Sequence, residues 1–129
     1  MKVKTFVCNM LHENCYLVYD EQSREAAVID PGFYWEEEKQ QFAQFIDDNQ
    51  LVIKYLLCTH LHFDHIFGVA GLKAASGAKV VIHKDDEVML YDVNKNEFAS
   101  NCIGYDFPVV DADIITEDGT ELMLGNSKI

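Results

Sequence analysis

The segment Leu51–Cys58, LVIKYLLC, limits the fold of this chain more than any other stretch. It is a nearly continuous apolar run of strand length, which is typical of a strand covered on both faces of its sheet. The preceding residues predict an amphipathic helix that starts with the acidic Glu36–Glu38 and ends near Asn49. Its apolar side chains recur at i, i+3 and i+4, at Phe42, Phe45 and Ile46. A helix followed by a buried strand predicts an α/β (α+β) fold with a layered sheet.

Short elements are predicted on both sides of this helix and strand. Strands at Val3–Val7, Cys15–Tyr19 and Ala26–Asp30, the last closed by the turn Pro31-Gly32, predict an antiparallel meander. The later elements are expected to be a helix over Ile66–Ala75 that stops at Gly77, a strand over Val80–Ile82, a helix over Asp85–Val93, and a hairpin of Ile114–Thr116 and Leu122–Leu124 around Asp118-Gly119. The segment 94–110 has no pattern that predicts a regular element.

Composition and charge narrow the class of protein. With 129 residues, of which 49% are hydrophobic and 25% charged, the chain has the balance of one globular domain covering 1–129. Twenty-two acidic against ten basic residues give a formal charge of -12, which repels nucleic acid and anionic lipid. No stretch approaches the roughly 20 apolar residues of a membrane span, and no signal peptide is recognisable, so we expect a cytoplasmic protein. The scattered Cys8, Cys15, Cys58 and Cys102 are expected to be reduced, structural thiols.

A cluster of metal-ligand side chains follows the buried strand directly, in the segment Thr59–His65. If the chain stays extended, His60, His62 and Asp64 point to one side, and a turn into the next helix brings His65 to join them. Imidazole and carboxylate groups bind zinc, iron or manganese, and the end of a buried strand is where ligand sites lie in layered sheets. A structural zinc site would more often be closed by cysteines, so this ligand set favours catalysis.

Other polar residues are expected to have no such role. His12 and His83 stand alone in the sequence, so we expect neither to be a ligand. The run Glu36–Glu38 is interpreted as a solvated helix start. The alternative for the Thr59–His65 segment is a polar loop whose histidines lie together by chance. Three histidines and an aspartate within seven residues argue against it.

The pattern H-x-H-x-D-H after a buried strand resembles the signature of the metallo-β-lactamase-fold hydrolases. The chain is similar to the glyoxalase II-like branch also in Asn14-Cys15-Tyr16, Val28–Gly32, Gly68, Gly71 and the Asp118-Gly119 turn. The resemblance implies a four-layer αββα domain. Family members complete their site with later histidines and an aspartate, but no histidine follows His83 here. The chain therefore corresponds to the N-terminal half of such a domain, in which His83 with Asp111 or Asp113 are weak candidates for substitute ligands.

The same resemblance assigns roles to residues. It implies that His60 and His62 bind a first metal ion and that Asp64 and His65 bind a second, with zinc expected and iron or manganese as alternatives. Asp64 would also hydrogen-bond the attacking water as the catalytic residue, and Asp30 would be a buried acid that braces the metal loop. The implied reaction is hydrolysis of a small-molecule substrate, a thioester or other small ester, by metal-bound hydroxide.

Two alternatives remain open from the sequence. The chain as it stands is either such a hydrolase or a catalytically incomplete metal-binding fragment that associates with itself. Self-association is expected because half of a two-sheet sandwich exposes an apolar sheet face. We therefore expect a homo-oligomer. A mononuclear iron dioxygenase acting on persulfides shares the H-x-H-x-D-H motif and is the further alternative.

Overall fold

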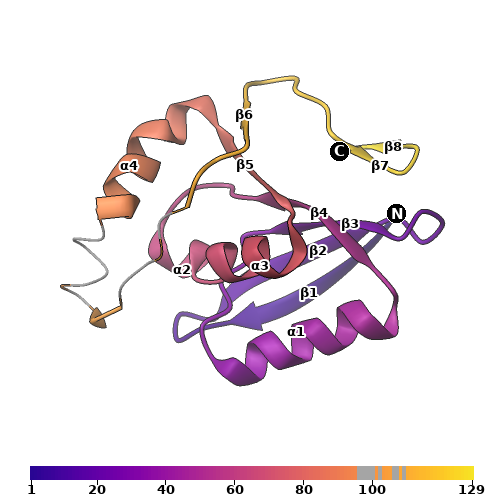
Figure 1. Ribbon diagram of the computed structural model, residues 1–129, viewed down its shortest axis with the longest axis horizontal. Coiled ribbons are helices and arrows are strands. Elements are labelled where there is room, and N and C mark those ends of the chain that lie inside the picture. Colours follow the sequence, from indigo (N-terminus) through magenta and orange to yellow (C-terminus); the bar gives the residue numbers. More distant parts are fainter. Residues whose placement is uncertain (96–100, 102, 106–107, 109) are drawn as a thin grey trace.

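The computed structural model describes residues 1–95, 101, 103–105, 108 and 110–129. The strands are β1 (Lys2–Cys8), β2 (Glu13–Tyr19), β3 (Glu25–Ile29), β4 (Val52–Leu57), β5 (Lys79–His83), β6 (Ile114–Thr116), β7 (Met123–Leu124) and β8 (Ser127–Lys128). The helices are α1 (Glu36–Asp48), α2 (Phe63–Ile66), α3 (Val69–Ser76) and α4 (Glu87–Lys95), with a 3-10 turn, η1, at Lys84–Asp86. Figure 1 shows α4 at the β5 side of the molecule, away from α1. The part of the chain described contains no helix that is both long and apolar enough to cross a membrane.

Six strands form one mixed sheet in the order β1-β2-β3-β4-β5-β6. The first three pair antiparallel, with Val3 opposite Val18 and Tyr16 opposite Ile29, which confirms the predicted meander. From β3 onward each neighbour is parallel, so β3 to β6 end at the same rim of the sheet. This α/β arrangement confirms the fold class expected from the buried LVIKYLL run.

The main core lies between one face of the sheet and the helices α1 and α3. Phe42 of α1 and Val69 of α3 pack in one cluster with Leu17, Val28 and Leu56 from the strands. Fully buried apolar side chains of this kind contribute roughly 1.5–3 kcal/mol each to the stability of the fold. Three cysteines, Cys8, Cys15 and Cys58, are buried free thiols as predicted, whereas Cys102 lies outside the described residues.

The predicted helix over Ile66–Ala75 is wrong as one continuous element. The chain forms the short α2 and then α3, with a break at Phe67-Gly68. At this break the Gly68 amide donates to the Pro31 carbonyl at 2.7 Å, and a Cβ at Gly68 would lie 2.7 Å from the same oxygen. The tertiary contact with the Pro31-Gly32 turn therefore interrupts a helical pattern. The predicted stop at Gly77 is confirmed, with Gly77 in the left-handed conformation at φ 71°.

The predicted hairpin between Ile114–Thr116 and Leu122–Leu124 is also wrong. β6 pairs parallel with β5 at the sheet edge, and β7 pairs with β8 across Gly125-Asn126. The Asp118-Gly119 turn exists, with the Thr120 amide donating to the Glu117 carbonyl at 3.0 Å, but its two arms separate. Burial decides this outcome, because β6 covers the edge of β5 while Leu124 is fully buried over Ala27, Tyr55 and Val81.

Part of the sheet face opposite α1 and α3 is uncovered. The β7–β8 hairpin lies against β3, where the Gly125 amide donates to the Glu25 carboxylate at 2.7 Å. Nearer the β1 edge, large apolar side chains are exposed, with Val3 at 64%, Val7 at 61% and Tyr16 at 40%. Strand alternation places them on this face, since Phe6 and Leu17 point into the main core.

Candidate metal centre

The metal-ligand residues gather where the parallel strands β3 and β4 end. Asp30 follows β3 directly, and its backbone amide donates to the Leu57 carbonyl at the end of β4 at 2.9 Å. The chain then leaves β4 at Cys58, whose amide donates to the Val81 carbonyl of β5 at 3.1 Å. Three strands thus fix the start of the loop that carries the histidines. Loops at this rim of a parallel sheet are the usual place for ligand sites.

Two of the four predicted ligands, His60 and His65, lie with Asp30 in one group of possible metal-binding side chains, and His62 and Asp64 adjoin this group without belonging to it. The ring centroid of His60 lies 4.7 Å from that of His62 and 4.0 Å from that of His65. The His65 Nε2 atom lies 3.4 Å from Asp64 Oδ2. The route differs from the one predicted, because the extended chain ends at His62 and α2 begins at Phe63. Asp64 and His65 therefore reach the cluster from the first turn of a helix, which folds them back over the loop.

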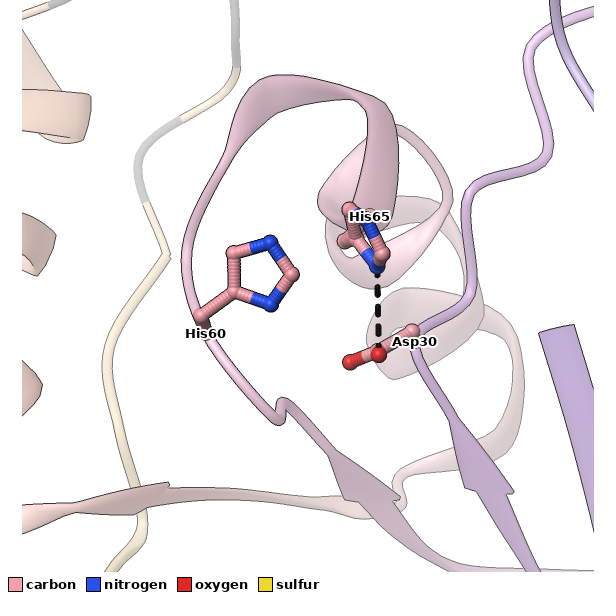
Figure 2. Close-up of side chains that lie close together, drawn as sticks. All are labelled: Asp30, His60 and His65. Carbon is pink, nitrogen blue, oxygen red and sulfur yellow. Dashed lines mark hydrogen bonds and ion pairs between the residues drawn. The ribbon is translucent and has the colours of Figure 1, made fainter. Parts of the chain in front are cut away.

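Asp30 lies beneath this cluster and is 5% exposed. Its Oδ1 atom accepts a hydrogen bond from the Thr59 amide at 2.7 Å, and its Oδ2 atom accepts one from the Thr59 hydroxyl at 2.5 Å. Oδ2 also lies 3.1 Å from His65 Nδ1. Figure 2 shows Asp30 at the end of its strand with the dashed contact to His65, and His60 on the loop beside them. These are the contacts that a brace for the metal loop requires.

The orientation of His65 leaves one ring nitrogen for a metal. Because a carboxylate can only accept a hydrogen bond, the contact with Asp30 places the proton on Nδ1. The Nε2 atom then keeps its lone pair and faces Asp64. Asp30, His60 and His65 each offer a ligand atom, and these atoms all lie within 4.8 Å of one another. This donor set of imidazole nitrogens and carboxylate oxygens fits a divalent transition metal.

The electrostatics of the cluster keep an imidazole neutral. Burial lowers the pKa of His60, and the neighbouring His65 and His62 lower it further, while Asp30 and Asp64 act in the opposite direction. A histidine must be neutral to bind a metal ion. Burial and the two neighbouring rings therefore favour the neutral form of His60, which is the form that can bind a metal ion.

Glu13 is a buried acid of this centre that sequence reasoning missed. Its side chain is 2% exposed, and among the residues that the structure describes neither carboxylate oxygen has a hydrogen-bond partner. Oε1 lies 3.5 Å from His65 Nδ1. Burial raises the pKa of Glu13 to about 8, with Asp30, Asp64 and Glu38 contributing in the same direction. The only sequence signal for it is its place next to Asn14-Cys15-Tyr16, which the resemblance singled out without assigning Glu13 a role.

Asn9 is the second residue that sequence reasoning missed. It is 4% exposed, and its side-chain amide donates to the Gly32 carbonyl at 2.9 Å and to the Asp64 carbonyl at 2.8 Å. Its backbone amide donates to Glu38 Oε1 at 2.7 Å. Glu38 Oε2 in turn accepts from the amides of Tyr34 and Trp35. Asn9 therefore connects the Gly32 turn, the α1 start and the metal loop.

These contacts correct the prediction for one acidic residue at the start of α1. Glu38 is not a solvated carboxylate, because its oxygens cap the start of α1 and hold Asn9, whereas Glu36 and Glu37 are exposed. His12 is exposed in the β1–β2 loop, and His83 Nδ1 accepts from the Asp85 amide at 3.3 Å. Neither belongs to the Asp30, His60, His65 group.

The substitute ligands considered at the sequence level find other partners. Asp113 Oδ2 accepts from the Val80 amide at 2.8 Å and pairs with Lys73 Nζ at 2.9 Å. The Asp111 carbonyl accepts from Lys73 Nζ at 3.0 Å. These contacts fix the segment before β6 to the edge of β5, where Asp113 has a structural role.

Comparison with known proteins identifies the family to which this chain belongs. A model of the metallo-beta-lactamase superfamily matches residues 9–127. The chain belongs to this superfamily. Among curated relatives, it is 32% identical over 95 residues to a hydroxyacylglutathione hydrolase of Pelagibacter ubique, a match that covers 73% of this chain and 37% of the relative. The chain thus spans less than half the length of this metallo-beta-lactamase superfamily relative.

Solved structures of the superfamily share the fold. The B3 metallo-beta-lactamase BLEG-1 aligns with a TM-score of 0.78 at 23% identity, covering 98% of this chain and 58% of that one. The protein TTHA1623, solved in a di-iron-bound form, aligns with a TM-score of 0.71 at 27% identity. The alignment covers 92% of this chain and 56% of TTHA1623. These alignments confirm the metallo-β-lactamase fold, and the chain covers less than 60% of each of the two neighbouring structures.

Proposed function

We propose that this chain carries the metal centre of a metal-dependent hydrolase that cleaves a thioester or another small ester. The observation that supports it most is the convergence of His60, His62, Asp64 and His65 at the rim of the sheet, with His65 oriented by Asp30. A metal ion bound there would lower the pKa of a bound water and polarise the scissile carbonyl. Zinc is the proposed metal, with iron or manganese as alternatives.

The proposed roles follow the positions of the side chains. His60 and His62 lie together on the loop and would hold one ion, while Asp64 and His65 lie together in α2 and would hold the second. Asp64 also has an oxygen with which to accept a hydrogen bond from the attacking water, which orients the water toward the substrate. Thr59 and Asp30 keep the loop in place below.

The proposed substrate class is a small-molecule thioester. Water adds to the thioester carbonyl, the carbon–sulfur bond breaks, and the products are a carboxylic acid and a thiol. A thiolate is a good leaving group, so this reaction needs little help from a general acid. The relative named hydroxyacylglutathione hydrolase supports the choice, because the chain shares 32% identity with it over 95 residues.

An assay with a glutathione thioester as substrate tests this function, and the rate of hydrolysis is measured from the thiol that is released. We expect Asp64→Asn to lower kcat/KM by about 100-fold or more, because it removes a ligand and the oxygen that orients water. The matched control is His83→Ala, a histidine outside the cluster, which should leave the rate unchanged. A wild-type rate that a chelator does not reduce would contradict the proposal. Uptake of oxygen by iron-loaded protein with a persulfide would instead identify the dioxygenase alternative.

A second candidate is a metal-binding unit that is inactive alone and associates with a second copy. The observation that favours it is the exposed apolar group of Val3, Val7 and Tyr16 on one sheet face. Light scattering after size exclusion should then show a dimer for the wild type and a monomer for the double variant Val3→Lys/Val7→Lys. Val88→Lys, at an exposed valine of α4, is the control and should leave the dimer intact. A monomeric wild type would rule this candidate out.

A further inference from the structure

We propose that Asn9 and Glu13, which flank the β1–β2 loop, are positioning residues for the Asp64–His65 half of the metal centre. The inference rests on the proposed function and assigns a role to a loop that carries none of the H-x-H-x-D-H residues. Both residues are buried and polar, and both are far from this motif in sequence. Their contacts lead to the two residues of α2 that would hold the second ion.

Asn9 fixes the backbone of Asp64. Its side-chain amide has two N–H donors, and both are used, one on Gly32 and one on Asp64. Asn9 itself adopts the left-handed conformation at φ 53°, which asparagine tolerates better than most residues. This conformation aims its amide inward, while Glu38 holds its backbone. The carbonyl of Asp64 is thereby fixed, and with it the direction in which the Asp64 side chain leaves the chain.

The residues around Gly32 are closely packed, so their side chains have little room to move. A Cβ added at Gly32 would lie 2.2 Å from the Asp64 carbonyl oxygen, 2.3 Å from Glu13 Oε2 and 2.9 Å from Asn9 Nδ2. Gly32, Asn9, Glu13 and Asp64 are therefore in direct contact around one point. A shift in the β1–β2 loop must move the start of α2.

Glu13 acts on the other residue of the pair. Its Oε1 atom lies 3.5 Å from His65 Nδ1, and Asp30 Oδ2 lies 3.1 Å from the same nitrogen. Two buried carboxyl groups thus flank the Nδ1 side of the ring and turn Nε2 toward Asp64. Among the described residues the Glu13 oxygens have no hydrogen-bond partner, so the ring of His65 is the polar group that this buried side chain faces.

Asn9 and Glu13 should affect the binding of one of the two proposed metal ions more than the other. Asn9 and Glu13 contact the Asp64–His65 pair, whereas His60 and His62 lie on the loop that Asp30 and Thr59 brace. Loss of either positioning residue should lower the affinity for the second equivalent of metal and leave the affinity for the first nearly unchanged. Residues that only stabilise the fold would weaken both equivalents together.

Zinc titration against a chromophoric chelator, with cobalt absorption spectra of the same proteins, tests this inference. The variants are Asn9→Gly, which fits the positive φ without strain, and Glu13→Gln, which keeps the shape of the side chain. We expect the affinity for the second equivalent to fall about 10- to 100-fold, as is typical when a residue behind a ligand is lost. The cobalt band of the second equivalent should shift, and Glu13→Asp should recover part of the affinity.

Matched controls separate positioning from stability. Asn49→Gly removes an asparagine whose side chain also donates to a backbone carbonyl, that of Phe45, but at the end of α1. Glu25→Gln removes a carboxylate that pairs with Lys54 at the far end of the sheet. Both should bind metal as the wild type does. Each test variant is independent, so one that fails to fold leaves the other to decide.

Three outcomes are distinguishable. Selective weakening of the second equivalent supports the positioning role. Equal affinities in the wild type and in both variants, or equal weakening of both equivalents, would overturn this inference while the proposed function stands. A wild-type chain that binds no zinc or cobalt would overturn the proposed function and this inference with it.

Discussion

The Nδ1 atom of His65 lies 3.1 Å from Oδ2 of Asp30, although the two residues are 35 positions apart in the chain. The same oxygen accepts the hydroxyl of Thr59, and Oδ1 accepts the Thr59 amide. One buried carboxylate therefore joins the end of β3, the loop after β4 and the helix α2. Because these segments contain the proposed ligands, the geometry of the centre depends on Asp30.

Replacing this carboxylate should destabilise the fold and weaken metal binding. Asp30→Asn keeps the size and tolerates the φ of 51°, but its amide cannot accept all the hydrogen bonds that Asp30 accepts. We expect the free energy of unfolding to fall by about 1–3 kcal/mol, from a urea titration of metal-free protein. Asp48→Asn, which alters an exposed aspartate on α1, should change it by less than about 0.5 kcal/mol. An Asp30→Asn protein as stable as the wild type would show that Asp30 is not a brace.

The contact point around Gly32 should not accept a methyl group. In Gly32→Ala the new Cβ would lie 2.2 Å from the Asp64 carbonyl, so either β3 or α2 must move. We expect a loss of about 3 kcal/mol of stability, measured by thermal and urea unfolding. Gly71→Ala is the matched control. Beyond its own helix and chain neighbours, no atom of the described residues lies within 4 Å of its Cβ position. Because Gly71 lies inside α3, the substitution should stabilise the protein by about 0.5–1 kcal/mol. Similar effects of the two substitutions would contradict this packing.

The buried acid Glu13 should make the metal-free protein less stable as the pH rises. The pKa of Glu13 is raised from 4.5 to about 8 in the folded chain, so the folded state binds more protons than the unfolded state between these values. Stability from this group is full below about pH 4.5 and is lost as the pH rises toward 8. The difference in unfolding free energy between Glu13→Gln and the wild type should therefore grow in favour of the variant across this window.

Urea titrations at several pH values in the presence of a chelator measure this difference. Glu25→Gln is the control, since hydrogen bonds from Gly125 and Lys54 lower the pKa of Glu25, the opposite direction. A pH-independent difference between Glu13→Gln and the wild type would contradict the burial of an uncompensated acid at this position.

The sequence predicted the features that depend on local pattern. The LVIKYLLC run corresponds to β4, the Phe42, Phe45, Ile46 spacing corresponds to α1, and the three histidine rings lie side by side. These features are local because periodicity and ligand spacing are read from neighbouring residues. The prediction that His60, His62, Asp64 and His65 lie together needed only the seven residues that contain them.

The features that the sequence did not predict depend on distant contacts. The break between α2 and α3 comes from the Pro31 carbonyl, and the separation of β6 from β7 comes from burial of Leu124 over the sheet. Neither contact leaves a pattern in the residues it joins. Asn9 and Glu13 were missed for the same reason, since their partners are 55 and 52 positions away, at Asp64 and His65.

The metal content per chain measures directly whether the histidine cluster binds ions. The protein is purified without chelator or added metal and measured by elemental analysis beside His65→Ala and the control His83→Ala. We expect close to two ions per wild-type chain, the same content in His83→Ala, and a clear loss in His65→Ala. Well under one ion per wild-type chain, or no difference between His65→Ala and His83→Ala, would contradict the assignment of His60, His62, Asp64 and His65 as a metal centre.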